Sequence, residues 1–139
     1  MKLFKYAATA CLLTMSYASM ADVAVIVNKA NTSAISDSDI SRIFLGKDKS
    51  FSSGGSVTPA NLTSGDETRA GFEEKALGKN SQQVKAYWSK LIFSGKAKPL
   101  KEIGSAEEAI AFVTANTDAI AYIDASKVND SVKVVKVFK

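Results

Sequence analysis

The sequence contains no histidine, and its single cysteine, Cys11, lies close to the N-terminus. These absences exclude a Ser-His-Asp or Cys-His nucleophile system and most transition-metal sites from the rest of the chain. The sequence also has neither a Walker-type loop nor a GxGxxG stretch, so it offers no recognisable loop for nucleotide phosphates. The carboxylate pairs Asp37/Asp39 and Glu73/Glu74 are typical of helix starts and solvent-facing helix surfaces. We therefore expect a protein that is not an enzyme and that carries no metal or cofactor.

The first twenty or so residues have the pattern of a bacterial secretory signal peptide. Two lysines precede a mostly apolar run over residues 7–15, and Ser19-Met20-Ala21 places small residues where a signal peptidase cleaves. The apolar run is shorter than the roughly 20 residues that a membrane-spanning helix needs. We predict that residues 1–21 are a signal peptide, that residues 22–139 form the mature domain, and that nothing inserts into a membrane after cleavage.

The predicted mature domain is long enough for one domain and contains no cysteine, so its stability must come from an ordinary core rather than from disulfides. Removal of Lys2 and Lys5 leaves 16 basic residues against 14 acidic ones. The lysines are spread along the chain, and we therefore predict no nucleic-acid binding.

Short apolar runs alternate with capped, amphipathic segments. Strands are expected at 23–27, 57–62, 119–123 and 132–137. Helices are expected to begin at Ser36, Ser81 and Ser105, with a further helix ending at Gly78, and residues 95–104 are expected to form a loop. Pro59 cannot donate a ladder hydrogen bond, so the second strand should lie at an edge or be interrupted there. This order predicts an α/β layer sandwich.

The stretch from 63 to 78, TSGDETRAGFEEKALG, is the best candidate for a binding site. It follows a strand and opens a helix, where free N–H groups and polar side chains converge on anions. The candidate anion-binding residues are Ser64, Gly65, Thr68 and Arg69. A purely structural interpretation is equally consistent with the residues: Ser64 and Glu67 fit a capping box, and Arg69 fits an ion pair with Glu73. The adjacent aromatics Tyr87 and Trp88 are interpreted as core residues.

Five segments, in this order along the chain, resemble the phosphate-binding proteins of bacterial ABC transporters, which belong to the periplasmic binding protein superfamily. They are Val25-Ile26-Val27-Asn28-Lys29, Ile43-Phe44-Leu45-Gly46-Lys47, Val57-Thr58-Pro59, Thr68-Arg69-Ala70-Gly71-Phe72 and Ala119-Ile120-Ala121-Tyr122-Ile123. The resemblance covers nearly all of residues 22–139. It implies a single-lobe, periplasmic-binding-protein-like layer sandwich with a mixed sheet flanked by helices.

The chain departs from this family in two respects. Members of the family have two lobes that enclose the anion, whereas this chain is long enough for one, so a second lobe, a second copy or a transporter component would have to close the cleft. The family also implies a Ser-Gly-Thr turn at a helix start. Thr68 and Arg69 keep their places here, but Asp66 and Glu67 stand where Ser and Gly are expected.

The resemblance implies a periplasmic or secreted solute-binding module that takes phosphate or a related oxyanion and is linked to phosphate uptake. The alternative is a lobe of the same fold that has lost its ligand and serves as an interaction or structural domain. The charges of Asp66 and Glu67 separate the two hypotheses, because a carboxylate at the site repels an arriving anion.

Overall fold

The computed structural model describes residues 21–139, so the predicted signal peptide lies outside the described residues except for Ala21. The strands are β1 (Val23–Val27), β2 (Thr58–Leu62), β3 (Lys101–Ile103), β4 (Ala119–Asp124) and β5 (Lys133–Phe138). The helices are α1 (Asp37–Phe44), α2 (Glu67–Leu77), α3 (Ser81–Phe93), α4 (Ala106–Ala115) and the short 3₁₀ helix η1 (Ala125–Lys127).

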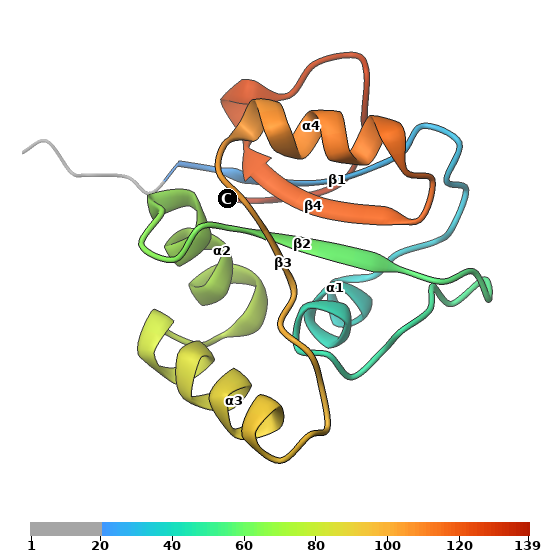
Figure 1. Ribbon diagram of the computed structural model, residues 1–139. Coiled ribbons are helices and arrows are strands. Elements are labelled where there is room, and N and C mark those ends of the chain that lie inside the picture. Colours follow the sequence, from blue (N-terminus) through green and yellow to red (C-terminus); the bar gives the residue numbers. More distant parts are fainter. Residues whose placement is uncertain (1–20) are drawn as a thin grey trace, which may run out of the picture.

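The five strands form one mixed sheet in the order β3-β2-β4-β1-β5. β2 runs parallel to both β3 and β4, whereas β1 runs antiparallel to its neighbours β4 and β5. Helix α4 covers one face of the sheet, and α1 and α2 cover the other (Figure 1). The predicted layer sandwich with a mixed sheet is therefore confirmed.

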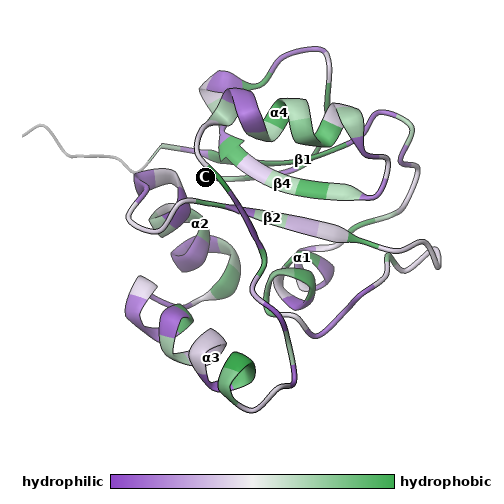
Figure 2. Ribbon diagram, viewed as in Figure 1, coloured by the Kyte–Doolittle hydropathy of each residue, from purple (hydrophilic) through white to green (hydrophobic). Residues whose placement is uncertain are grey.

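Strand alternation divides the core into two layers. In β1, Val23, Val25 and Val27 face α1 and α2, whereas Ile26 faces α4. Every residue of β1 is buried because helices cover both faces of the sheet, as its continuous apolar sequence predicts. Figure 2 shows the hydrophobic colour concentrated along β1, β4 and the inner side of α4.

Most helix boundaries agree with the capping residues. The Ser36 hydroxyl accepts from the Asp39 N–H, and the Asp39 carboxylate accepts from the Ser36 N–H, which completes a capping box at α1. Gly78 ends α2 with a φ of 65°, a conformation that favours glycine. The start of α3 differs by one residue: Asn80, not Ser81, is its N-cap, because Asn80 and Gln83 form the reciprocal pair of hydrogen bonds.

The structure corrects one prediction about strands and decides between the two alternatives of another. Residues 101–103, expected within a loop, form the short edge strand β3. Of the two outcomes predicted for β2 at Pro59, an edge position or an interruption, the second is confirmed: β2 lies inside the sheet, but its pairing with β3 does not extend to the proline. The proline is tolerated because β3 pairs only with Ala60–Leu62, while β4 pairs with β2 over Thr58 and Pro59. Pro59 is therefore not required to donate a hydrogen bond to β3.

The two ends of the described lobe lie on neighbouring strands. In the β1–β5 pair, Val23 at the start of β1 is opposite Phe138 at the end of β5. A register shift between Val25 and Ile26 interrupts this pairing, and the two strands remain paired on both sides of it.

The side chain of Tyr122 links three elements beneath the sheet. Its ring stacks on Phe72 of α2 at 3.9 Å between centroids and meets Phe44 of α1 edge-on at 5.5 Å. Its hydroxyl donates to Asn61 Oδ1 at 2.9 Å and accepts from the Leu62 N–H at 3.3 Å. Burial raises the pKa of Tyr122 well above its usual range, so the phenol stays neutral and keeps both hydrogen bonds.

We expect Tyr122→Phe to lower the free energy of unfolding by about 1–3 kcal/mol, because it leaves a buried N–H of Leu62 without its acceptor. Urea unfolding followed by circular dichroism measures the change. Tyr87→Phe is the matched control: its hydroxyl donates to the Leu45 carbonyl at 2.7 Å from a half-buried position, so its loss should cost less. An equal effect of the two substitutions would contradict this role of Tyr122.

Candidate functional site

The N-cap of helix α2 is an aspartate rather than the predicted serine. Asp66 is its N-cap, and Asp66 Oδ1 accepts from the N–H groups of Thr68 at 2.8 Å and Arg69 at 3.2 Å. The predicted capping box of Ser64 with Glu67 is therefore wrong. The turn at Gly65, where φ is 89°, places Ser64 too early to reach the first turn of the helix. The carboxylate of Asp66 occupies two N–H groups that an anion at this helix start would use.

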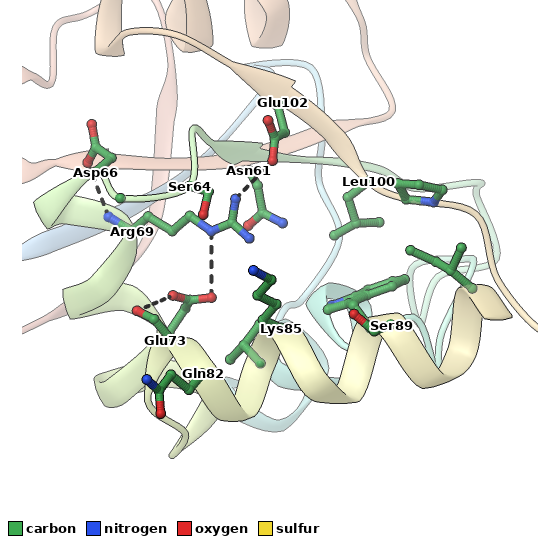
Figure 3. Close-up of a pocket in the computed structure, with 16 residues that line it drawn as sticks. Asn61, Ser64, Asp66, Arg69, Glu73, Gln82, Lys85, Ser89, Leu100 and Glu102 are labelled. Carbon is green, nitrogen blue, oxygen red and sulfur yellow. Dashed lines mark hydrogen bonds and ion pairs between the residues drawn. The ribbon is translucent and has the colours of Figure 1, made fainter.

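The guanidinium of Arg69 is held by groups from two sides (Figure 3). Nη1 donates to the Leu62 carbonyl at 2.9 Å and to Glu102 Oε1 at 3.2 Å, and Nε lies 3.6 Å from Glu73 Oε2. The ion pair of Arg69 with Glu73 is thus formed, but it is buried rather than on an exposed helix face. Among the described residues, these contacts leave the Nη2 amino group of Arg69 without a protein acceptor.

Glu73 is the one fully buried acidic side chain among residues 21–139, with 3% of its surface exposed. Its carboxylate accepts from the Ser81 hydroxyl at 3.1 Å in addition to pairing with Arg69. A buried carboxylate without such partners is strongly destabilising, so Arg69 has a structural role here whatever it binds.

A cavity of about 380 Å³ opens beside the start of α2, between α2, α3 and the segment that leads into β3. Of the four predicted site residues, Ser64, Gly65 and Arg69 line it, and Thr68 does not. The opposite wall is apolar and is made of Val84, Trp88, Ile92, Pro99 and Leu100. The cavity thus joins a charged side to an apolar side.

Besides Asp66, seven further polar or charged residues line the same cavity and were not predicted from the sequence as site residues: Asn61, Glu73, Ser81, Gln82, Lys85, Ser89 and Glu102. They come from β2, α2, α3 and β3, and no local sequence pattern brings them together. Asp66, Glu73 and Glu102 outnumber Arg69 and Lys85 in the lining, so acidic groups exceed basic groups at this site.

Trp88 and Leu100 lie between this cavity and a second one of about 360 Å³, because both residues line both cavities. The tip of the Trp88 ring lies against Gly46, where an added Cβ would approach within 2.8 Å of Trp88 Cη2. The indole N–H is buried and has no hydrogen-bond partner among the described residues. The prediction that Trp88 belongs to the core is confirmed. Its indole N–H is thus a hydrogen-bond donor that lies, without an acceptor among these residues, in the wall between the two cavities.

Within residues 21–139, no group of three or more Asp, Glu, His or Cys side chains is placed to hold a metal ion. In the same residues, none of the helices combines the length and the apolar character that spanning a membrane requires.

No protein-family model matches the chain, and no curated protein matches its sequence. Solved structures do match its fold. An ABC-type phosphate transport receptor from Vibrio cholerae is 18% identical, with a TM-score of 0.65 over 85% of this chain and 47% of the other. A putative phosphate ABC transporter substrate-binding protein from Clostridium perfringens, solved with bound phosphate, is 22% identical, with a TM-score of 0.66 over 84% and 46%.

A possible phosphate binding protein from Planctomyces limnophilus is 14% identical, with a TM-score of 0.61 over 84% of this chain and 42% of that one. The described residues therefore share their fold with about half of each of these solved structures, as the sequence resemblance predicts. The chain spans about half the length of the solved structures that it matches.

We expect Glu73→Ala to lower the free energy of unfolding by about 3 kcal/mol, because it leaves the largely buried guanidinium of Arg69 without its nearest intrahelical acceptor. Glu102→Ala removes the other carboxylate that contacts Arg69. That side chain is 54% exposed, so the loss should stay below about 1 kcal/mol. Chemical unfolding of both variants tests the difference, and equal losses would show that burial of Glu73 does not set the strength of this pair.

Proposed function

We propose that this chain is a solute-binding lobe without catalytic activity that takes phosphate or a related oxyanion at the start of α2. One observation carries the proposal: Ser64, Gly65 and the Arg69 guanidinium meet in a single cavity at the carboxyl end of β2. Arginine suits this role because its planar fork can donate two hydrogen bonds to one oxyanion. The fold, shared with proteins described as phosphate-binding, supports the same assignment.

The local charges predict weak binding. The Asp66 carboxylate already accepts from the Thr68 and Arg69 N–H groups, so an anion would compete with it for the helix start. The same charge repels a phosphate dianion, and a repulsion of about 1.4 kcal/mol lowers affinity tenfold. A dissociation constant in the millimolar range is therefore the expected outcome for inorganic phosphate with the isolated lobe.

The proposal includes a partner that covers the cavity. The solved structures that share the fold are about twice as long as this chain, and here the cavity is lined by one lobe alone. A second copy, a separate lobe or an ABC transporter component would exclude water from the site and strengthen every charged contact in it.

A second candidate function rests on Asp66 itself. A carboxylate that caps α2 from within satisfies the N–H groups that a bound anion would satisfy in its place. Under this alternative the lobe binds no solute and serves as an interaction or structural domain outside the cytoplasm.

Titration calorimetry with phosphate, supported by thermal unfolding, distinguishes the two functions. Under the proposed function, Asp66→Ser should bind phosphate at least about tenfold more tightly than the natural chain, because serine keeps a capping oxygen and removes the charge. Arg69→Ala should abolish binding. Arg69 also neutralises buried Glu73, so Arg69→Ala alone leaves a buried carboxylate without its cation. The double substitution Arg69→Ala with Glu73→Ala removes both charges and is the control for folding. The single substitution Ser64→Ala, at an exposed residue, is a second control for folding.

If neither the natural chain nor Asp66→Ser releases heat or gains thermal stability at millimolar phosphate or sulfate, the solute-binding function is excluded and the interaction domain is favoured. Retention of binding in a folded Arg69 variant would place the anion elsewhere.

We further propose that the chain is exported to the periplasm or beyond, with cleavage after Ala21. The N-terminal pattern of two lysines, an apolar run and Ser19-Met20-Ala21 supports this. Mass spectrometry of the protein recovered from a periplasmic fraction should give a mature chain that begins at Asp22. Recovery of the uncleaved chain in the cytoplasm alone would contradict it.

A further inference from the structure

The end of α3 carries an aromatic side chain that packs against nothing. Phe93, its last residue, is 97% exposed, and the preceding Ile92 is 41% exposed. The other exposed large hydrophobic residues among residues 21–139, Val134 and Val137, are far better covered than Phe93. An exposed phenylalanine costs solubility, and such an exposed apolar group is a marker of an interaction surface.

The charges around Phe93 all have one sign. Residues 75–101 contain seven lysines and no acidic residue, whereas the rest of residues 21–139 contains nine basic and fourteen acidic residues. The lysines are spread along the whole chain, but the acidic residues are not. The positive charge of this region results from the absence of acidic residues from α3 and its flanks. Three of the seven, Lys90, Lys96 and Lys98, lie within five residues of Phe93. We call these three lysines together with Ile92 and Phe93 the α3 tip.

Neighbouring acidic residues do not neutralise the α3 tip. Asp48, which lines the second cavity together with Lys96 and Lys98, is paired with Arg42 at 3.1 Å. Glu102, at the far end of the following loop, is paired with Arg69. Within the described part of the chain, Lys90, Lys96 and Lys98 form no ion pair, so their charges face solvent.

Other residues attach α3 to the lobe. Val84 and Trp88 are its buried residues, and the Tyr87 hydroxyl donates to the Leu45 carbonyl at 2.7 Å. Phe93 therefore has no part in holding the helix in place. Figure 1 shows α3 and the loop after it at the end of the molecule opposite α4, and Figure 2 shows hydrophobic colour at the C-terminal end of the helix.

We propose that the α3 tip binds the surface of membranes that contain anionic lipids, with Phe93 entering the headgroup region and the three lysines facing lipid phosphates. Charge complementarity supports this occupant, since lysines near an anionic membrane each strengthen binding and their long stems reach the headgroups. The exposed position of Phe93, at the end of a helix rather than within a groove, suits a deformable lipid surface better than an acidic protein. The contact is peripheral and reversible, because one aromatic and three lysines fall far short of a spanning segment.

Vesicle binding tests this proposal. The full chain and residues 22–139, whose folding is checked by circular dichroism, are sedimented with vesicles of phosphatidylcholine alone or with about 30% phosphatidylglycerol, at low and high salt. Each variant is compared with the natural sequence of the same length, so any binding by residues 1–21 contributes equally to both. We expect binding to the anionic vesicles only, lost at high salt. The triple variant Lys90→Glu, Lys96→Glu, Lys98→Glu should bind at least about a hundredfold more weakly, because each charge reversal removes an attraction and adds a repulsion.

Two controls give the test its specificity. The triple variant Lys29→Glu, Lys127→Glu, Lys139→Glu changes the net charge equally at exposed residues outside the α3 tip and should retain most of the binding. Phe93→Ser should weaken binding several-fold, whereas Val134→Ser on β5 should not. In Phe93→Trp, brominated lipids should quench the new indole but not buried Trp88, the only natural tryptophan.

The proposal is overturned if anionic vesicles bind no form of the chain at low salt, or if the two triple variants lose binding equally. Binding that depends on the three lysines but is unchanged in Phe93→Ser, without quenching of the new indole, would also overturn it and assign the α3 tip to an acidic macromolecule. None of these variants changes Arg69 or Asp66, so the result is independent of phosphate binding.

Discussion

The position of the candidate site depends on the side chain of Tyr122. From the middle of the sheet it stacks on α2, meets α1 edge-on and uses its hydroxyl to fix the backbone and side chain at the end of β2. The chain turns into the site directly after that point. One neutral phenol, kept protonated by burial, therefore holds the end of β2 in place directly before the turn that leads into α2.

Beyond that turn, the protein's own carboxylates already pair with the groups that would otherwise attract an anion. Asp66 satisfies the first N–H groups of α2, while Glu73 and Glu102 neutralise Arg69. Such internal pairing stabilises a helix start and a buried arginine, and the same pairing makes an incoming anion compete with the protein's own carboxylates. The stability of the lobe and its affinity for an anion are thus opposed at the start of α2. For this reason the charge of Asp66 distinguishes the two proposed functions.

What the sequence predicts correctly is local. The apolar run of β1, the Ser36 cap and the glycine that ends α2 each follow from neighbouring residues, and the structure confirms them. What it does not predict depends on distant partners. β3 is a strand because β2 lies beside it, and Glu102 joins the site only through that pairing. The cap of α2 was missed because Ser64 and Asp66 are both good capping residues, and the turn at Gly65 chooses between them.

The antiparallel placement of β1 has a consequence for how this lobe can be joined to other sequences. Because Val23 and Phe138 lie opposite each other, the chain enters and leaves the lobe at one point of the sheet. A lobe with this geometry can be inserted into a longer polypeptide through two short adjacent linkers, or circularly permuted, with every strand pairing preserved. The connections of this lobe to other domains can therefore change while its core stays the same.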